Sequence, residues 1–294
     1  MRSSTPSPST SLGISRREAL GILGLGVASF LVSPVAHARE ALSEPEGSGT
    51  LLFTASDVEM LAIDWTAGGV KVMVDDTRGK DQIRVYETAR PGFIGLMPPV
   101  MECTLWHKTL TIDYGSVFLS FLPRGSKDLT VIVPSSLADH LKQLSIDGAS
   151  GSYEVSDIKA TAFDVNIASG KLTASNIAVQ ELDLDMASGT VAIDGRIEDS
   201  VDMDFASGTV QLTCREVCPR DIDIDAASGW LTLAIPENDG FEVRVQKLSG
   251  SVAIDFETTR KSGSDEIYVY KNGTDGSSID VDIMSGSIHI ERSE

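Results

Sequence analysis

The stretch ELDLDMASGTVAID, residues 181–194, is repeated almost unchanged on both sides of itself. Nineteen residues earlier the chain reads AFDVNIASGKLTAS (162–175), and nineteen residues later it reads SVDMDFASGTVQLT (200–213). Each copy turns about a Ser-Gly pair that follows alternating acidic and apolar residues. A fixed period of this length is typical of proteins built by stacking one small structural unit many times.

Seven Ser-Gly pairs mark the repeat, and their glycines are Gly151, Gly170, Gly189, Gly208, Gly229, Gly250 and Gly286. The steps between them are 19, 19, 19, 21, 21 and 36 residues. The last step is close to two periods, so we expect one unit there to have lost its Ser-Gly pair. Glycine suits a turn because it adopts a positive φ without a steric penalty. The neighbouring serine can bond the bent backbone, and an alanine two residues before the glycine is small enough for a corner.

Apolar residues occupy the positions seven and five before each glycine and two and four after it, as Leu182, Leu184, Val191 and Ile193 do around Gly189. Alternation with polar residues is typical of strands with one buried face. One such unit cannot bury its apolar face alone, but stacked units share a core. The sequence therefore predicts an all-β, single-domain parallel β-helix or β-solenoid whose coils of 19–21 residues turn at the Ser-Gly pairs. A further apolar column indicates a short third side: Ile158, Ile177, Ile197 and Val217.

The remainder of the chain divides by composition. We predict an export signal at 1–38, a linker at 39–50, irregular first coils or a cap at 51–143, and regular coils at 144–292. The stretch LAIDWTAGGVKVMV (61–74) fits the repeat with Gly68 at the turn. Further strands are expected at 82–88, 104–114 and 129–134. We interpret the whole segment 51–143 as first coils or a cap because a solenoid needs its open ends covered.

The first 38 residues look like a bacterial twin-arginine export signal. Arg16-Arg17 precede an apolar run of 17 residues that ends in Ala36-His37-Ala38, although Ala19 stands where the pattern usually has Phe. We expect cleavage, export to the cell envelope or the outside, and no membrane span in the mature chain. An uncleaved signal would instead remain as a membrane anchor, since 17 residues is the short limit of a span.

The charge and the cysteine content limit the possible partners, disulfides and metal sites. The formal net charge is −19, which argues against nucleic acid as a partner, because phosphate binding needs a basic face. Cys214 and Cys218 could form a short-loop disulfide outside the cytoplasm or remain free thiols. The cysteines and histidines lack metal-ligand spacing.

An acidic face is the strongest candidate for a functional site. On four successive coils, outward positions carry one asparagine, Asn166, and seven aspartates: Asp164, Asp183, Asp185, Asp202, Asp204, Asp223 and Asp225. Like charges about 4.8 Å apart repel by about 0.9 kcal/mol per pair in water. The face is either solvated, which keeps a long sheet soluble, or a metal site in which Ca²⁺ bridges neighbouring coils. No other cofactor is predicted.

The sequence predicts no catalytic residues. Seven equivalent serines cannot each have a general base, so we interpret the Ser-Gly pairs as structural. Some parallel β-helices cut acidic polysaccharides, and this is the enzymatic alternative. Here the aspartates lack nearby Arg or Lys and would repel an anionic glycan.

Two apolar stretches interrupt the first coils. They contain Phe93, Ile94, Leu96 and Met97, and then Val117, Phe118, Leu119, Phe121 and Leu122. These side chains either plug the end of the solenoid or, if exposed together, form a patch for a partner or membrane.

Three segments carry a family resemblance: LTVIVPSSLADHLKQLSIDGASG (129–151), LTLAIPENDGFEVRVQKLSGSVAID (231–255) and SSIDVDIMSGSIHIER (277–292). In this order they resemble the bacterial "putative adhesin" domain of unknown function, a β-solenoid of exported and membrane-tethered envelope proteins. The resemblance implies a non-enzymatic adhesin or surface scaffold that binds an envelope or extracellular protein or glycan. It also implies, as an alternative, a partner-binding module of envelope-stress sensing. Such an analogy carries no catalytic residues to this chain.

Overall fold

The computed structural model describes residues 50–77, 79–92, 95–115, 125–261, 266–271 and 276–293. The predicted signal and all of the predicted linker except Thr50 lie outside these ranges. The elements in chain order are β1 (Leu51–Thr54), η2 (Ala55–Asp57), β2 (Met60–Val74), β3 (Gln82–Ala89), β4 (Glu102–Trp106), β5 (Thr109–Asp113), β6 (Lys127–Val133), α1 (Ser135–Ala138), β7 (Leu141–Ser156), β8 (Lys159–Cys214), β9 (Asp221–Ile235), β10 (Gly240–Ile254), β11 (Thr258–Lys261), β12 (Glu266–Lys271) and β13 (Ser277–Arg292).

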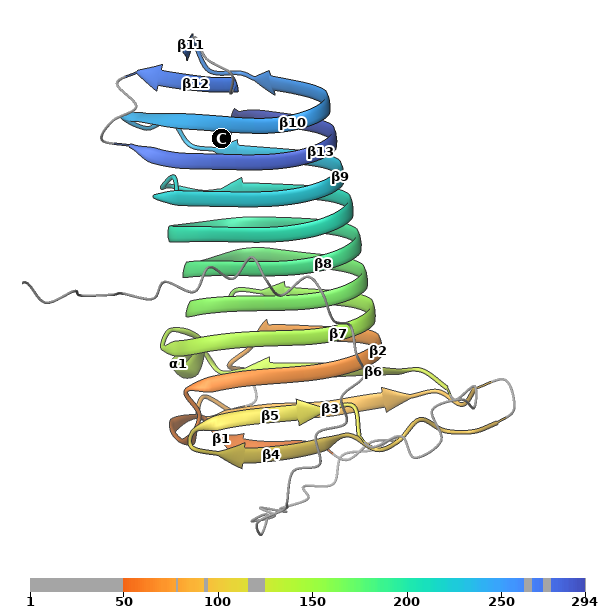
Figure 1. Cartoon of the computed structure of the whole chain (residues 1–294). Coiled ribbons are helices and arrows are strands. Elements are labelled where there is room, and N and C mark those ends of the chain that lie inside the picture. Colours follow the sequence, from red (N-terminus) through yellow and green to blue (C-terminus); the bar gives the residue numbers. More distant parts are fainter. Residues whose placement is uncertain are drawn as a thin grey trace, which may run out of the picture. The chain divides into compact units, whose positions relative to one another are not determined.

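The described strands form a β-solenoid, as predicted (Figure 1). Strand β8 alone contains three Ser-Gly corners, at Gly170, Gly189 and Gly208. Neighbouring coils pair in parallel with the repeat in register, so that Gly151 lies opposite Gly170 and Gly208 opposite Gly229. The predicted period therefore fixes which residues of successive coils lie over one another.

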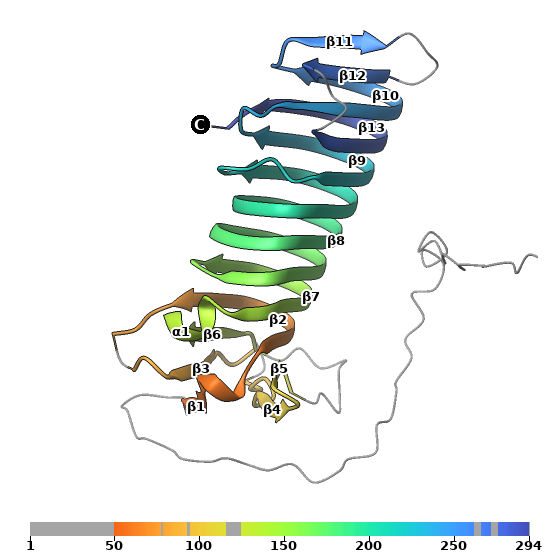
Figure 2. The same cartoon turned by 90° about the vertical axis from the view of Figure 1, so that its left-hand side faces the viewer.

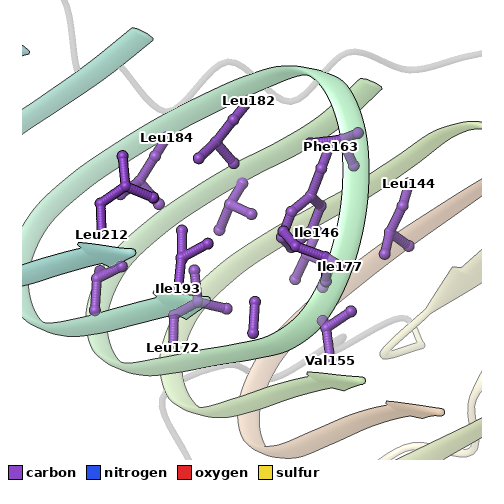
Figure 3. Close-up of a cluster of buried hydrophobic side chains, with 14 of the residues drawn as sticks. Leu144, Ile146, Val155, Phe163, Leu172, Ile177, Leu182, Leu184, Ile193 and Leu212 are labelled. Carbon is purple, nitrogen blue, oxygen red and sulfur yellow. The ribbon is translucent and has the colours of Figure 1, made fainter. Parts of the chain in front are cut away.

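The apolar columns form one continuous core. Leu144 pairs with Phe163 of the adjacent coil, and further along the solenoid Val201 pairs in the same way with Ile222. Figure 3 shows such side chains, among them Phe163, Leu172 and Leu182, pointing into the space that the coils enclose. The predicted third side is present for three of its four residues, because Ile158, Ile177 and Ile197 are buried and the amide of Ala178 donates to the carbonyl oxygen of Ile158 at 2.9 Å. The fourth residue, Val217, is only half-buried.

The corner glycines form a ladder in which each residue touches the backbone of the next. A Cβ on Gly208 would lie 2.3 Å from the carbonyl oxygen of Gly189, and one on Gly229 would lie 2.3 Å from that of Gly208. Gly208 also has a φ of 149°. Glycine is therefore required by close stacking as well as by conformation. Beside it, Ser169 donates to the carbonyl oxygen of Ala149 on the preceding coil, which is the structural role expected for the serine.

The order of the coils differs from the sequence at the C-terminal end. Strand β13 lies between β9 and β10, and it pairs in parallel with both (Figures 1 and 2). Gly286 therefore stacks between Gly229 and Gly250. The expectation that a coil between Gly250 and Gly286 had lost its Ser-Gly pair is wrong. The chain uses this interval to form the antiparallel strands β11 and β12 beyond β10 before it returns.

The N-terminal end is also covered by antiparallel strands. Strand β2 lies between β7 and a coil made of β5 and β6, while β3 pairs antiparallel with β6 and β1 with β3. The single strand expected at 104–114 is instead a hairpin of β4 and β5. His107 and Lys108, with φ values of 47° and 65°, form its turn, and left-handed residues of this kind favour a tight hairpin.

The apolar stretches predicted to plug the solenoid are only partly described. Leu96 and Met97 are 38% and 52% exposed, so these two side chains do not fill the core. The other seven residues named for this role lie outside the described residues.

A buried ion pair anchors the N-terminal cap to the solenoid. Lys127 is fully buried, and its Nζ donates to Glu87 Oε2 at 2.7 Å and to the carbonyl oxygens of Pro99 and Tyr114. The ammonium group also lies 4.7 Å from the centre of the Trp65 ring. Burial lowers the pKa of Lys127, and the hydrogen bond that Lys127 donates to Glu87 opposes this shift. Paired, hydrogen-bonded burial is how a protein interior accommodates such a charge.

The two alternatives for the cysteines are resolved in favour of free thiols, because Cys103, Cys214 and Cys218 are all unpaired. Burial raises the pKa of Cys214 and of Cys218. A raised pKa keeps a thiol protonated and unreactive. In the described part of the chain, no helix is long and apolar enough to cross a membrane.

Candidate functional site: an acidic ladder and an apolar ridge

The predicted acidic face is formed by outward residues of β8, β9 and β13. We call it the acidic ladder. Its outer column is Asp164, Asp183, Asp202, Asp223 and Asp280, and its inner column is Asn166, Asp185, Asp204, Asp225 and Asp282. These residues alternate with buried ones along each strand, which directs their carboxylates away from the core. The seven aspartates predicted from sequence therefore share one face.

The insertion of β13 lengthens this ladder by one coil. Asp280 pairs in register with Asp223, and Asp282 pairs with Asp225. The sequence shows both aspartates in the correct columns, but chain order separates them from β9 by the whole of β10. The non-sequential position of β13 is what sequence reasoning missed, and it carries no local sequence signal.

Carboxylate crowding changes the protonation of the ladder. Partial burial raises the pKa of Asp204 to about 6, and the nearby charges add to this effect, from Asp225, Asp185, Asp202 and Asp223 in that order. Burial and the neighbouring carboxylates Asp225, Asp202 and Asp280 also raise the pKa of Asp223. The middle of the ladder therefore retains protons at a pH where an ordinary aspartate has lost them.

Hydrogen-bond donors meet the two ends of the outer column. The side-chain amide of Gln143 donates to Asp164. At the other end Arg244 Nη1 lies 3.2 Å from Asp280 Oδ1, and the hydroxyl of Ser278 donates to Asp280 Oδ2 at 3.2 Å. The ladder thus ends where a guanidinium group takes the place of an aspartate in the same column.

The inner column continues beyond the ladder toward the N-terminal cap. Asp147, Asp64 and Asp113 follow one another on adjacent strands. Asp64, Asp147 and Asn166 line a shallow hollow of about 280 Å³. Burial raises the pKa of Asp64 and of Asp147, with nearby carboxylates as the next cause for Asp64. The hollow is acidic and open, without the enclosing apolar walls of a typical small-molecule site.

An apolar ridge runs along the Ser-Gly corner beside the inner column. It consists of the residues two before each corner glycine, in stacking order Ala149, Ala168, Ala187, Ala206, Ala227, Met284 and Leu248. All seven are exposed, and Met284 and Leu248 are 61% and 83% exposed. Alanine fits this corner as expected, but a small side chain is not required there, because the larger Met284 and Leu248 occupy the same position and point outward. Across the corner, Trp230 is 65% exposed.

Among the described residues, one group of three potential metal ligands lies close together outside the acidic ladder. Asp255, His289 and Glu291 bring one ligand atom each within 4.8 Å of one another. His289 Nε2 lies 3.1 Å from Asp255 Oδ2, and its Nδ1 lies 3.5 Å from Glu291 Oε2. None of the seven aspartates predicted as calcium ligands belongs to this group, and calcium binding by the ladder stays a prediction.

Comparison with known proteins identifies the family of this chain. The family model of the Toastrack DUF4097 domain matches residues 121–291, which is more than half of the chain. The chain belongs to the Toastrack DUF4097 family. The matched Toastrack region covers all the coils that carry the acidic ladder and the apolar ridge. Among curated proteins, none matches the sequence.

Several solved structures are similar to this Toastrack protein. A "putative cell adhesion protein" from Clostridium sporogenes is 13% identical, with 84% of this chain and 99% of that one covered and a TM-score of 0.37. A "putative adhesin" from Parabacteroides distasonis is 10% identical, with 83% and 97% covered and a TM-score of 0.41. A "putative lipid binding protein" from the same organism is 15% identical, with 83% and 96% covered and a TM-score of 0.35.

Proposed function

We propose that this protein is a non-enzymatic, exported component of the cell envelope that binds a basic partner through the acidic ladder and the apolar ridge, as an adhesin or surface scaffold. The observation that carries the proposal is the regular placement of nine aspartates, five in the outer column and four in the inner, beside exposed apolar side chains. A partner with Lys or Arg near an apolar stripe complements both features.

Physical chemistry supports binding over catalysis at this face. Rigid coils hold the carboxylates at the constant spacing of paired strands, about 4.8 Å. A field of one sign attracts cationic groups and speeds their encounter. The exposed Trp230, Met284 and Leu248 offer the apolar contacts that fix a complex once it has formed. The Ser-Gly serines bond backbone carbonyl oxygens, as Ser169 and Ser228 do.

The test is binding of the purified chain to sedimented cell-envelope fractions. The triple variant D202N/D204N/D223N neutralises the centre of the ladder, and D57N/D81N/D239N removes the same charge from exposed positions elsewhere. We expect the ladder variant to lose most of the binding and the matched variant to retain it. Binding should also weaken as salt rises, because exposed charges are screened. Equal binding by both variants would contradict the proposal.

The apolar ridge is tested separately. We expect M284S/L248S to bind the same fractions more weakly than the wild type while its salt dependence stays unchanged, because this variant keeps every charge. The matched control is L105S/V100S, which alters two other exposed apolar residues. If the ridge variant binds as well as its control, the ridge does not contribute and only the aspartates form the binding surface.

Export is part of the same proposal and rests on the sequence pattern at Arg16-Arg17. We expect the wild-type chain to be found outside the cytoplasm and the variant R16K/R17K to accumulate inside, because twin-arginine signals depend on this pair. Cell fractionation with an antibody against the mature domain measures both. Unchanged export of the variant would refute the twin-arginine route.

A further inference from the structure

The position of β13 is unusual because it lies between two strands that precede it in the chain and pairs in parallel with both. Phe241 of β10 pairs with Ser277, and Asp221 of β9 pairs with Ser278, so β13 begins between two strands already made. The contact continues to Ile254 of β10 and Ile235 of β9 at the far end. Strand β2 also lies between later strands, but these are added to its two free sides. Strands β5, β6 and β12 also lie between strands that precede them, but each of these has at least one antiparallel neighbour. Among the described strands, only β13 enters between two preceding strands and pairs in parallel with both.

Strand β13 contributes a full layer of the core. Its inward side chains are all at most 3% exposed, and they are Ile279, Val281, Ile283, Ile288 and Ile290. Before β13 arrives, the facing edges of β9 and β10 are unpaired and the apolar columns above and below it are open. Unpaired parallel edges beside an exposed apolar layer are a template for another strand.

Polar contacts make this slot specific for the sequence of β13. Arg244 of β10 bonds Asp280 at 3.2 Å, and the hydroxyl of Ser251 donates to that of Ser287 at 3.0 Å. Asp255, which follows β10, lies 3.1 Å from His289. At the corner, a Cβ on Gly286 would lie 2.1 Å from the carbonyl oxygen of Gly229, so only a strand with glycine at this place fits. The segment that meets all these conditions is β13 of this chain or of an identical one.

We propose that the slot between β9 and β10 is a strand-acceptor site that a second copy of this chain fills with its own β13, giving a reciprocal strand-exchanged dimer. Every contact of β13 is the same in the monomer and in the dimer, so the difference in free energy comes from the connection to β12 and from the entropy of association. The exchanged form is therefore favoured by high protein concentration during folding. This interface is separate from the acidic ladder's proposed partner.

Disulfide trapping tests the exchange in the full chain. Ser251 and Ser287 are a suitable pair because their Oγ atoms are 3.0 Å apart on neighbouring strands. A chain with S251C and a chain with S287C are mixed unfolded, refolded together at several concentrations and oxidised. We expect an interchain S251C–S287C disulfide on non-reducing gels, in an amount that rises with protein concentration, and a dimer by light scattering.

The matched control replaces S251C by T209C. Thr209 pairs with Trp230, and Trp230 pairs with Ser287, so residue 209 lies one coil too far from β13 for a disulfide. Both mixtures contain the same native cysteines. The double variant S251C/S287C, oxidised as a folded monomer, should stay monomeric at every concentration because its β13 is locked in place. If the S251C–S287C product does not exceed the T209C–S287C product and the chain refolds only to monomer, the proposal is overturned.

Discussion

Asp280 faces Asp223 across a single pair of parallel strands, although all of β10, β11 and β12 lie between them in the sequence. This pairing extends the acidic ladder to five coils. It also places two carboxylates side by side at a position where a simple sequential stack would have put Arg244 beside Asp223. The most acidic surface of the protein thus depends on the unusual position of its last strand.

The crowding predicts how stability changes with pH. The folded-state pKa of Asp204 is about 6, above its ordinary value of 3.8. Between these values the folded state binds more protons than the unfolded state, so the free energy of unfolding falls as pH rises from about 4 to about 6. We expect D204N to flatten this decline and to stabilise the protein above pH 6. Urea denaturation across this range measures it, with D239N as the control outside the ladder.

Calcium should relieve the same repulsion if it bridges neighbouring coils. We expect millimolar Ca²⁺ to raise the melting temperature more than Mg²⁺ at equal ionic strength, because Ca²⁺ accepts more carboxylate oxygens in irregular geometry. The effect should disappear in D202N/D204N/D223N. Equal shifts with the two cations would reduce the effect to screening and remove the ladder as a calcium site.

The glycine ladder predicts a contrast between two glycines with the same backbone conformation. Gly208 and Gly79 have φ values of 149° and 147°. A Cβ would be 2.3 Å from a carbonyl oxygen at Gly208, but 3.8 Å from its nearest atom at Gly79. Both alanine variants lose about 1–3 kcal/mol to backbone strain, and G208A loses more because its coils must separate. Urea denaturation compares them, and equal losses would show that conformation alone selects glycine.

The buried ion pair predicts a large effect from one lysine. K127M leaves Glu87 buried without its cation, which costs about 3–5 kcal/mol. K71M removes an exposed pair, in which Lys71 Nζ lies 3.8 Å from Glu154 Oε2, and should cost at most about 1 kcal/mol. Chemical denaturation measures both free energies of unfolding. A small loss in K127M would mean that the cap is held by its other contacts.

The regular coils could be predicted from sequence because every coil repeats the same local pattern. The alternation around Gly189 determines which side chains are buried, and the period determines which residues stack. The end regions could not be predicted in the same way. The β4–β5 hairpin turns on two non-glycine residues, His107 and Lys108, in left-handed conformations. A lysine such as Lys127 is expected at the surface from sequence alone. Its burial depends on Glu87 and Trp65, which are distant in the sequence but contact it in the fold.

The acidic ladder, too, could be predicted from sequence only in part. Its columns follow from the repeat, whereas the neighbours of Asp223 follow from the order in which coils are stacked. The repeat pattern around Gly286 fits the edge of any coil, so the pattern alone does not predict insertion beside β9 instead of addition beyond β10. The choice is made by β11 and β12, which occupy the outer edge of β10.

The final described residue, Ser293, donates its amide to the carbonyl oxygen of Ile235 at 2.9 Å, so this residue lies beside β9 and not at the β11–β12 end of the solenoid (Figure 2). Anything fused behind this residue, whether a reporter, an affinity tag or an immobilisation handle, would be carried at the side. Such a group would leave the β11–β12 end of the solenoid uncovered.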